Sequence, residues 1–199
     1  LLDDTHPLLE QDLQAGGLTL VREYSAPLEE LAAHHSDAEV LIIRSRMRVD
    51  AHFLNQFPSL KVIGRLGAGL ENIDLLEAEN RGISCQRVPE GNARAVAEHA
   101  LGMLLSLLNH LPRVHREIKE GKWLREPNKG RELQSLTAGI IGYGVMGSEF
   151  AQLLSAMGVK VLAYDKYKSG YAPDGVAEVS LVELQRRADV VSLHLPLTD

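Results

Sequence analysis

Three glycines, Gly142, Gly144 and Gly147, have the spacing G-x-G-x-x-G and follow a short apolar segment at 137–141. At this spacing the first glycine permits a tight turn, and the second lets a pyrophosphate approach the backbone. The third allows the following helix to pack closely against the strand. Because the chain contains 17 glycines, the spacing alone is weak evidence and needs support from its surroundings.

The residues that follow the turn supply that support. Apolar side chains recur there with the i, i+3, i+4, i+7 spacing of an amphipathic helix, at Phe150, Leu153, Leu154 and Met157. The N-terminus of such a helix presents free N–H groups to an anion. A second apolar segment, 160–164, ends at Asp165, near the place expected for an acid that binds ribose hydroxyls.

Asp165 also bears on the choice between NAD and NADP. An aspartate at this position repels the extra phosphate of NADP, so we expect NAD, although Lys166 and Lys168 lie close by in the sequence. The alternative interpretation of Asp165 is a solvated acid at the end of a strand.

Two arginines, Arg44 and Arg65, each follow an apolar segment in the first half of the chain. The carboxyl ends of parallel strands face the ligand crevice in α/β folds, and a planar guanidinium matches a carboxylate or a phosphate. Arg65 adjoins the Gly67-Ala68-Gly69 turn, which favours a binding role. The alternative for each is an ordinary surface arginine, and Arg46 and Arg48 are near enough to replace Arg44.

The segments that must position these residues alternate between short apolar runs and helix-periodic stretches. This alternation predicts βαβ units, parallel sheets and an α/β fold. The expected strands are 18–21, 40–43, 61–64, 83–85, 138–141, 160–164 and 190–193. Residues 1–4 have the composition of a further strand of which only the end is present.

The segment 93–111 is apolar nearly all round, which predicts a helix buried on most sides, with His99 in the core. We expect this helix to connect two lobes and to form a subunit interface together with the charged segment 113–130, which contains Trp123. The alternative is a central helix of a single domain.

Composition argues against several classes of protein. The net charge of −6 disfavours broad binding to nucleic acid, which needs a basic surface. The single cysteine, Cys85, cannot form an intrachain disulfide and fits a cytoplasmic protein, and no zinc-type spacing of cysteine and histidine predicts a metal. The longest apolar stretch, 100–111, contains polar residues and is too short to cross a membrane.

Several segments, in this order along the chain, resemble the D-isomer-specific 2-hydroxyacid dehydrogenases. They are 61–74, 89–99, the turn at 142–147, Tyr164-Asp165 and 190–198. The resemblance covers nearly the whole chain and is nearest to the 3-phosphoglycerate dehydrogenase-like branch, of which the chain matches the amino-terminal two-thirds. It implies a flavodoxin-like substrate lobe at residues 1–94 and a Rossmann NAD-binding lobe at residues 95–199.

The same resemblance implies an NAD-dependent enzyme that interconverts a D-2-hydroxy acid of the 3-phosphoglycerate type and its 2-oxo acid. It assigns substrate contacts to Arg44, Arg65, Gly67, Ala68 and Gly69, and cofactor contacts to Val96, Gly142, Gly144, Val145, Met146, Gly147, Asp165, Leu195 and Pro196. One departure is visible. The family usually has an asparagine just before the Pro-x-Gly-Asn stretch, where this chain has Arg87-Val88.

The resemblance assigns no catalytic residue within the chain. Removing a hydride from a hydroxyl-bearing carbon requires a base, for which histidine is suited, and a cation that orients the carboxylate. In the family these are an Arg, a Glu and a His that follow the segment at 193–198, so we expect them after Asp199, in the remainder of the Rossmann lobe. We expect neither His99 nor His194 to replace them. The alternative function is an NAD-responsive binding protein, like the corepressor relatives of the family. A homodimer is expected in either case.

Overall fold

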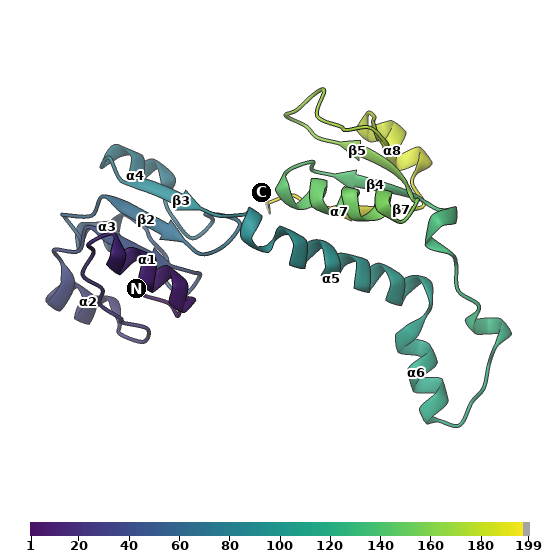
Figure 1. Cartoon of the computed structure of the whole chain (residues 1–199), viewed down its shortest axis with the longest axis horizontal. Coiled ribbons are helices and arrows are strands. Elements are labelled where there is room, and N and C mark those ends of the chain that lie inside the picture. The colour runs from purple at the N-terminus through teal and green to yellow at the C-terminus, as the bar shows by residue number, and fades with distance from the viewer. Residues whose placement is uncertain (197–199) are drawn as a thin grey trace. The chain divides into compact units, whose positions relative to one another are not determined.

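The computed structural model describes residues 1–196, and the chain divides into two compact units, Leu1–Pro89 and Glu90–Asp199 (Figure 1). Strands and helices alternate in both units and every strand pair is parallel, which confirms the predicted α/β class. The predicted lobe boundary after residue 94 falls inside helix α5 (Glu90–Leu108). None of the helices in the described part of the chain has the length and apolar character needed to span a bilayer.

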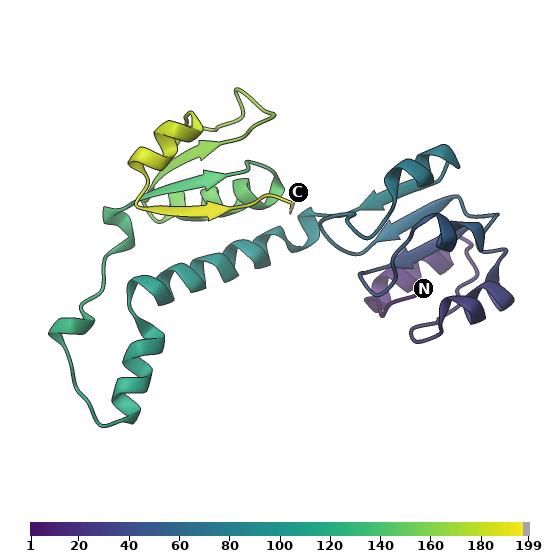
Figure 2. The same ribbon diagram turned by 180° about the vertical axis from the view of Figure 1, so that it is seen from behind.

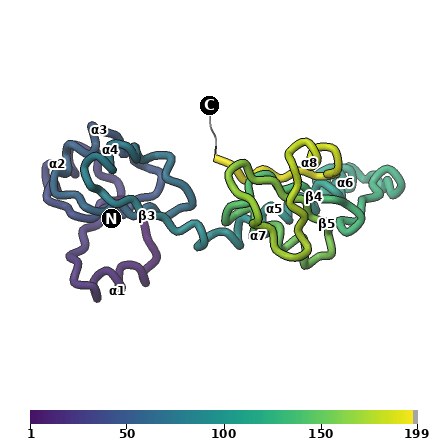
Figure 3. The backbone as a smooth tube through the Cα atoms, turned by 90° about the horizontal axis from the view of Figure 1, so that it is seen from above, coloured from purple at the N-terminus to yellow at the C-terminus, as the bar shows by residue number. Residues whose placement is uncertain are grey.

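The first unit contains a three-stranded sheet with helices on it. Its elements are α1 (Pro7–Ala15), α2 (Leu28–His35), β1 (Val40–Ile43), α3 (Ala51–Asn55), β2 (Val62–Arg65), α4 (Leu75–Asn80) and β3 (Ser84–Arg87), and the strands have the order β1-β2-β3. The core is made of side chains such as Ile43, Phe53 and Ile63, which are all buried. Helix α1 buries no residue and lies apart from the other helices of this unit (Figure 3).

Two further segments extend this sheet by hydrogen bonds without forming regular strands. The Leu2 amide donates to the Ile42 carbonyl at 2.9 Å, and the Glu23 amide donates to the Leu1 carbonyl at 2.9 Å. The order across the unit is therefore 21–23, 1–2, β1, β2 and β3, which is the flavodoxin-like order. The predicted strand at 18–21 was wrong, because this segment has no regular structure.

The second unit contains a four-stranded parallel sheet in the order β6-β5-β4-β7 (Figure 2). Its strands are β4 (Thr137–Ile141), β5 (Lys160–Tyr164), β6 (Val176–Glu178) and β7 (Val190–Leu193), and its helices are α5, α6 (Leu111–Lys119), α7 (Val145–Ala156) and α8 (Leu181–Arg187). In chain order this is the 3-2-1-4 arrangement that begins a Rossmann fold. Strand β6 was not expected from the sequence.

The two faces of this sheet are covered by different helices. Helices α5 and α7 pack side by side on one face, and α8 packs on the other (Figures 1 and 3). On the α8 face, Gly139 of β4 allows close contact, since a Cβ there would lie 2.6 Å from Leu184 Cδ2. The end of β4 is thereby held between two layers of helices, and this end carries the glycine-rich turn.

Among the described residues of the second unit, helix α5 is covered on one face only. Ala97, Leu104 and Leu108 are buried, whereas Met103 is 58% and Leu107 is 69% exposed. The prediction that this helix is buried on most sides was therefore wrong for the single chain. His99 is exposed and does not lie in the core. An apolar helix with an open apolar face suggests a further partner for that face.

Candidate functional site

The glycine-rich turn begins at Gly142, immediately after β4. Gly142 has a φ of 91°, which favours glycine, and its amide donates to the Tyr164 carbonyl at 2.9 Å. A Cβ at this position would lie 2.4 Å from the His194 carbonyl oxygen. Gly142 therefore permits both the turn and the close approach of the chain that leaves β7.

The other two glycines have different surroundings. A Cβ on Gly147 would lie 2.0 Å from the Gly142 carbonyl oxygen, so Gly147 allows α7 to pack against the turn. Gly144, the N-cap of α7, has an ordinary φ of −86°, and a Cβ there would meet no atom within 4 Å. No steric contact within the fold requires a glycine at 144, whereas the approach of a ligand to the open backbone does.

Helix α7 begins at Val145 and Met146, and no side chain caps its N-terminus. The first amides of a helix lack partners within the helix, and the helix dipole places partial positive charge at this end. Both residues belong to the turn that Gly144 leaves open. The arrangement fits a pyrophosphate group and thus the NAD that the sequence predicts.

Asp165 lies just after β5 and is bonded to the turn. Its Oδ2 accepts from the Tyr143 amide at 2.8 Å, and its Oδ1 accepts from the Tyr167 amide at 2.9 Å. Partial desolvation opposes ionisation, but these amides and the charge of Lys168 outweigh it and lower the pKa of Asp165 below its usual value. The carboxylate is thus ionised and held beside the second residue of the glycine motif.

The two lysines near Asp165 are not equivalent. Lys168 Nζ donates to the Tyr143 carbonyl at 3.0 Å, and this contact stabilises the turn next to Asp165. Lys166 Nζ lies 5.2 Å from the centre of the Tyr167 ring, in a cation–π arrangement. Tyr143 stacks on Tyr171 with ring centres 4.9 Å apart, and burial raises the pKa of Tyr171 to about 12.

The end of β7 reaches the same turn. The His194 amide donates to the Ile141 carbonyl at 2.9 Å, and a Cβ at Gly142 would lie 2.8 Å from Leu195 Cδ2. Leu195 and Pro196 are exposed, and their assignment to the cofactor stays a prediction. Desolvation lowers the pKa of His194, whose ring packs on Phe150 and contacts Ser192 Oγ at 3.0 Å.

Most of the predicted cofactor residues therefore meet at the carboxyl edge of the second unit's sheet. They are Gly142, Gly144, Val145, Met146, Gly147, Asp165 and Leu195, with Pro196 next in the chain. Val96 is half-buried in α5, and its assignment to the cofactor stays a prediction.

The predicted substrate residues lie in the first unit. Arg65 ends β2, its side chain is 15% exposed, and its Nη1 donates to the Gly69 carbonyl at 2.5 Å. The same guanidinium pairs with Glu71 at 3.3 Å, and its Nε is buried without a partner among the described residues. An N–H in this state favours an incoming anion, because an unpaired buried donor is costly.

The turn that Arg65 contacts contains Gly67, Ala68 and Gly69. A Cβ at Gly67 would lie 3.1 Å from Arg65 Nη1, and a Cβ at Gly69 would overlap the Glu71 carboxylate at 1.6 Å. Both glycines thus leave space for the Arg65–Glu71 pair beside the turn.

Arg44 and Arg46 have distinct roles in the structure. Arg46 donates to the carbonyls of Leu2, Glu23 and Ala26, so it holds the chain together and does not replace Arg44. Arg44 is exposed, its amide donates to Asp3 Oδ2 at 2.6 Å, and no partner for its guanidinium is found in the described part of the chain. Its side chain is therefore free to bind an anion.

Two residues near these sites were not predicted as site residues. Arg87, noted only as a departure from the family pattern, donates from Nη1 to the Ala68 carbonyl at 2.8 Å. Glu71 pairs with Arg65, a contact that no spacing rule reveals. A separate cavity of about 420 Å³ beside β1 contains none of the predicted site residues.

Comparison with known proteins finds one matching family model and several similar enzymes. Residues 101–199 match the family model described as D-isomer specific 2-hydroxyacid dehydrogenase, NAD binding domain. The chain is 37% identical over 197 residues to a D-3-phosphoglycerate dehydrogenase of Rattus norvegicus, covering 98% of this chain and 37% of the relative. It is 38% identical over 174 residues to a hydroxypyruvate reductase of Thermotoga maritima, covering 86% of this chain and 56% of the relative.

A solved structure is similar over both units. The D-lactate dehydrogenase of Aquifex aeolicus, in complex with NAD and lactic acid, has a TM-score of 0.81 and 32% identity, covering 96% of this chain and 58% of that one. The chain thus spans from about one-third to about three-fifths of the length of these relatives.

Proposed function

The chain belongs to the D-isomer-specific 2-hydroxyacid dehydrogenase family, and we propose that the whole protein oxidises a D-2-hydroxy acid, or reduces its 2-oxo acid, with NAD. The observation that carries this proposal is the open backbone at Gly144 beside the ionised Asp165. These two features offer separate partners to the pyrophosphate and to the adenosine ribose of one dinucleotide.

Each cofactor residue has a defined task in this proposal. The amides of Val145 and Met146 donate to the pyrophosphate, and Gly144 lets it approach. Asp165 accepts from the ribose hydroxyls with the lone pairs that its two backbone contacts leave free. Leu195, Pro196 and Val96 line the remainder of the cofactor site. NAD, when bound, exchanges a hydride with the carbon that bears the hydroxyl.

The substrate residues bind and orient the acid. The Gly67 amide donates to the Arg65 carbonyl at 3.0 Å, so in this proposal the amides of Ala68 and Gly69 and the guanidinium of Arg65 bind the carboxylate, while Arg44 supplies a second cation. A second anionic group on the acid matches this second cation, which favours a substrate of the 3-phosphoglycerate type. No catalytic acid or base is assigned to a residue of this chain.

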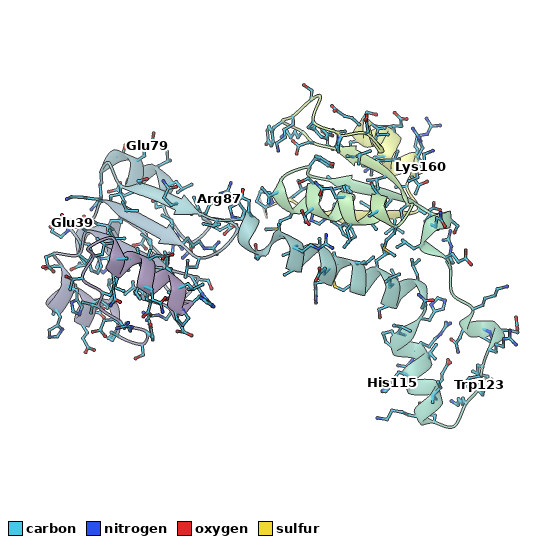
Figure 4. All side chains as sticks on the ribbon, in the orientation of Figure 1. Glu39, Glu79, Arg87, His115, Trp123 and Lys160 are labelled. Carbon is cyan, nitrogen blue, oxygen red and sulfur yellow. The ribbon has the colours of Figure 1, made fainter. Side chains whose placement is uncertain are left out.

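We further propose a homodimer that uses the open face of α5. That face carries Met103 and Leu107. The charged segment 113–130 carries Trp123, which is 81% exposed and lies away from α5 (Figure 4). Exposed aliphatic and aromatic side chains such as these are typical of subunit interfaces. The single cysteine further leads us to propose a cytoplasmic location.

The proposed activity is tested on the full-length protein with NAD(H) and a panel of 2-hydroxy and 2-oxo acids. We expect turnover of at least one such pair, together with NAD binding by calorimetry. Binding of NAD without turnover of any acid would instead support the NAD-responsive binding protein. Absence of NAD binding would contradict both functions.

A further inference from the structure

Three arginines lie together at the carboxyl edge of the first unit's sheet. Arg65 and Arg87, the last residues of β2 and β3, are partners in the strand register, and Ile43 of β1 is the partner of Arg65 on the other side. Arg44 follows Ile43 directly. The sheet therefore places the three backbone positions in one row, within one compact unit.

Two of the three guanidinium groups meet the same turn. Arg65 donates to the Gly69 carbonyl at 2.5 Å, and Arg87 donates to the Ala68 carbonyl at 2.8 Å. Paired residues of parallel strands point to the same face of the sheet, which explains how both side chains reach consecutive residues of one turn. Arg87 lies at the tip of β3, where Figure 4 labels it.

The charges at this edge favour an anionic ligand. Two carboxylates contact these residues and each already has a partner, because Asp3 accepts from the Arg44 amide and Glu71 pairs with Arg65. Arg87 is exposed and uses one N–H on Ala68, so most of its five donors have no partner within residues 1–196. The whole chain has a net charge of −6, so this row is a local exception.

We propose that Arg87 is a specificity-determining residue that binds the second anionic group, a phosphate, of the substrate. The proposal rests on the proposed function, since it places a 2-hydroxy acid carboxylate at the neighbouring turn. Arg65 and the amides of Ala68 and Gly69 bind the carboxylate, and Arg87 binds the phosphate. An arginine stands where the family usually has asparagine, so a contact from this position to the phosphate would be a feature of this chain.

A purely structural role for Arg87 makes a different prediction. If Arg87 only fastened the turn through Ala68, its loss would disturb the carboxylate site and would weaken every substrate equally. If it binds phosphate, its loss weakens phosphorylated substrates selectively. D-3-phosphoglycerate and D-glycerate are a matched pair for this comparison, because they differ only in the phosphate.

The test compares the full-length wild type with three variants, using NAD and both acids. Arg87→Asn installs the family's usual residue, and Arg87→Lys keeps the charge without the planar fork. Arg81→Asn is the matched control, because Arg81 precedes β3 at its other end and pairs with Glu77 and Asn55. kcat and KM are measured for each acid, and binding of D-3-phosphoglycerate is measured by calorimetry.

We expect Arg87→Asn to raise KM for D-3-phosphoglycerate about tenfold with little change in kcat, and to leave D-glycerate within about twofold. Arg87→Lys should fall between, and Arg81→Asn should match the wild type. An equal loss for both acids, no loss for either, or a wild type that prefers D-glycerate would overturn the proposal. If the wild type oxidises no acid of the wider panel, the proposed function fails, and calorimetry decides separately whether Arg87 binds the phosphorylated acid.

Discussion

Replacing Gly144 by alanine should weaken NAD binding without unfolding the turn. The backbone of Gly144 has a φ of −86°, which alanine adopts, and the new Cβ would meet no atom within 4 Å. Alanine restricts the unfolded chain more than glycine does, which stabilises the fold by about 0.4–1 kcal/mol. Alanine is also less favoured than glycine at an N-cap, which costs a similar amount. The net change in the free energy of unfolding is then within about 1 kcal/mol.

The effect on NAD follows from the space that this Cβ fills. A hydrogen bond to a charged group contributes about 1.5–3 kcal/mol, and the methyl group keeps the pyrophosphate from the open backbone at this point. We therefore expect the Kd for NAD to rise about 10- to 100-fold. Calorimetry of the full-length variant with NAD measures this change.

Gly147→Ala is the contrasting variant in the same turn. Its Cβ would lie 2.0 Å from the Gly142 carbonyl oxygen, and neither backbone can move without displacing α7. Overpacking of this kind costs about 3 kcal/mol, or about 6–12 °C in melting temperature for a chain of this size. A Gly144→Ala protein that melts like the wild type and binds NAD with unchanged affinity would refute the placement of the pyrophosphate over this turn.

Three further predictions concern other residues. Asp165→Asn should weaken NAD binding about tenfold and reduce the preference for NAD over NADP, and calorimetry with both nucleotides would contradict this if the preference did not change. Burial lowers the pKa of His194 in the folded state. The neutral imidazole should therefore make its full contribution to the free energy of unfolding above the usual pKa of 6.5, and this contribution should be lost as the pH falls below that value. Urea denaturation at a series of pH values should show a steeper loss of stability for wild type than for His194→Gln, and equal slopes would disprove the assignment. Leu107→Asp should convert the dimer to monomers in size-exclusion chromatography with light scattering, whereas Leu8→Asp, which alters an exposed leucine of α1, should not.

The sequence predicts the strands best where apolar runs are short and bounded by glycine or polar residues. The predicted bounds of β1, β5 and β7 are those observed, because each is a short apolar run that pairs in a parallel sheet. The segment at 18–21 has a similar composition but no regular pairing, and β6 is too short and polar to show a pattern. Local composition cannot report whether a neighbouring strand is present.

The environment of α5 illustrates a second limit. Its apolar residues on all sides predict burial, and the structure buries only the face that contacts α7. Periodicity identifies which residues are apolar, but the identity of the covering partner depends on the assembly. His99 was misplaced for the same reason, since it lies on a helix whose composition suggested a core.

The candidate sites show the same division between what spacing reveals and what contacts reveal. The turn at 142–147 and Asp165 were found by spacing, because their geometry is set by a short continuous βαβ unit. The link from Arg87 to Ala68 joins the last residue of β3 to the turn after β2, and only the register of β2 and β3 brings them together. Pairing across a sheet is not encoded in local spacing.

The contacts of Lys168 strengthen the case for NAD over NADP. From sequence alone, Lys168 was a potential cation for the extra phosphate of NADP. In the structure its Nζ donates to the Tyr143 carbonyl, while Asp165 accepts from the Tyr143 amide. The backbone of Tyr143 therefore binds both charged side chains. To bind the phosphate, Lys168 would have to leave this carbonyl, and the phosphate would still lie beside an ionised carboxylate that two backbone amides keep in place. The contacts that stabilise the glycine turn therefore also disfavour NADP.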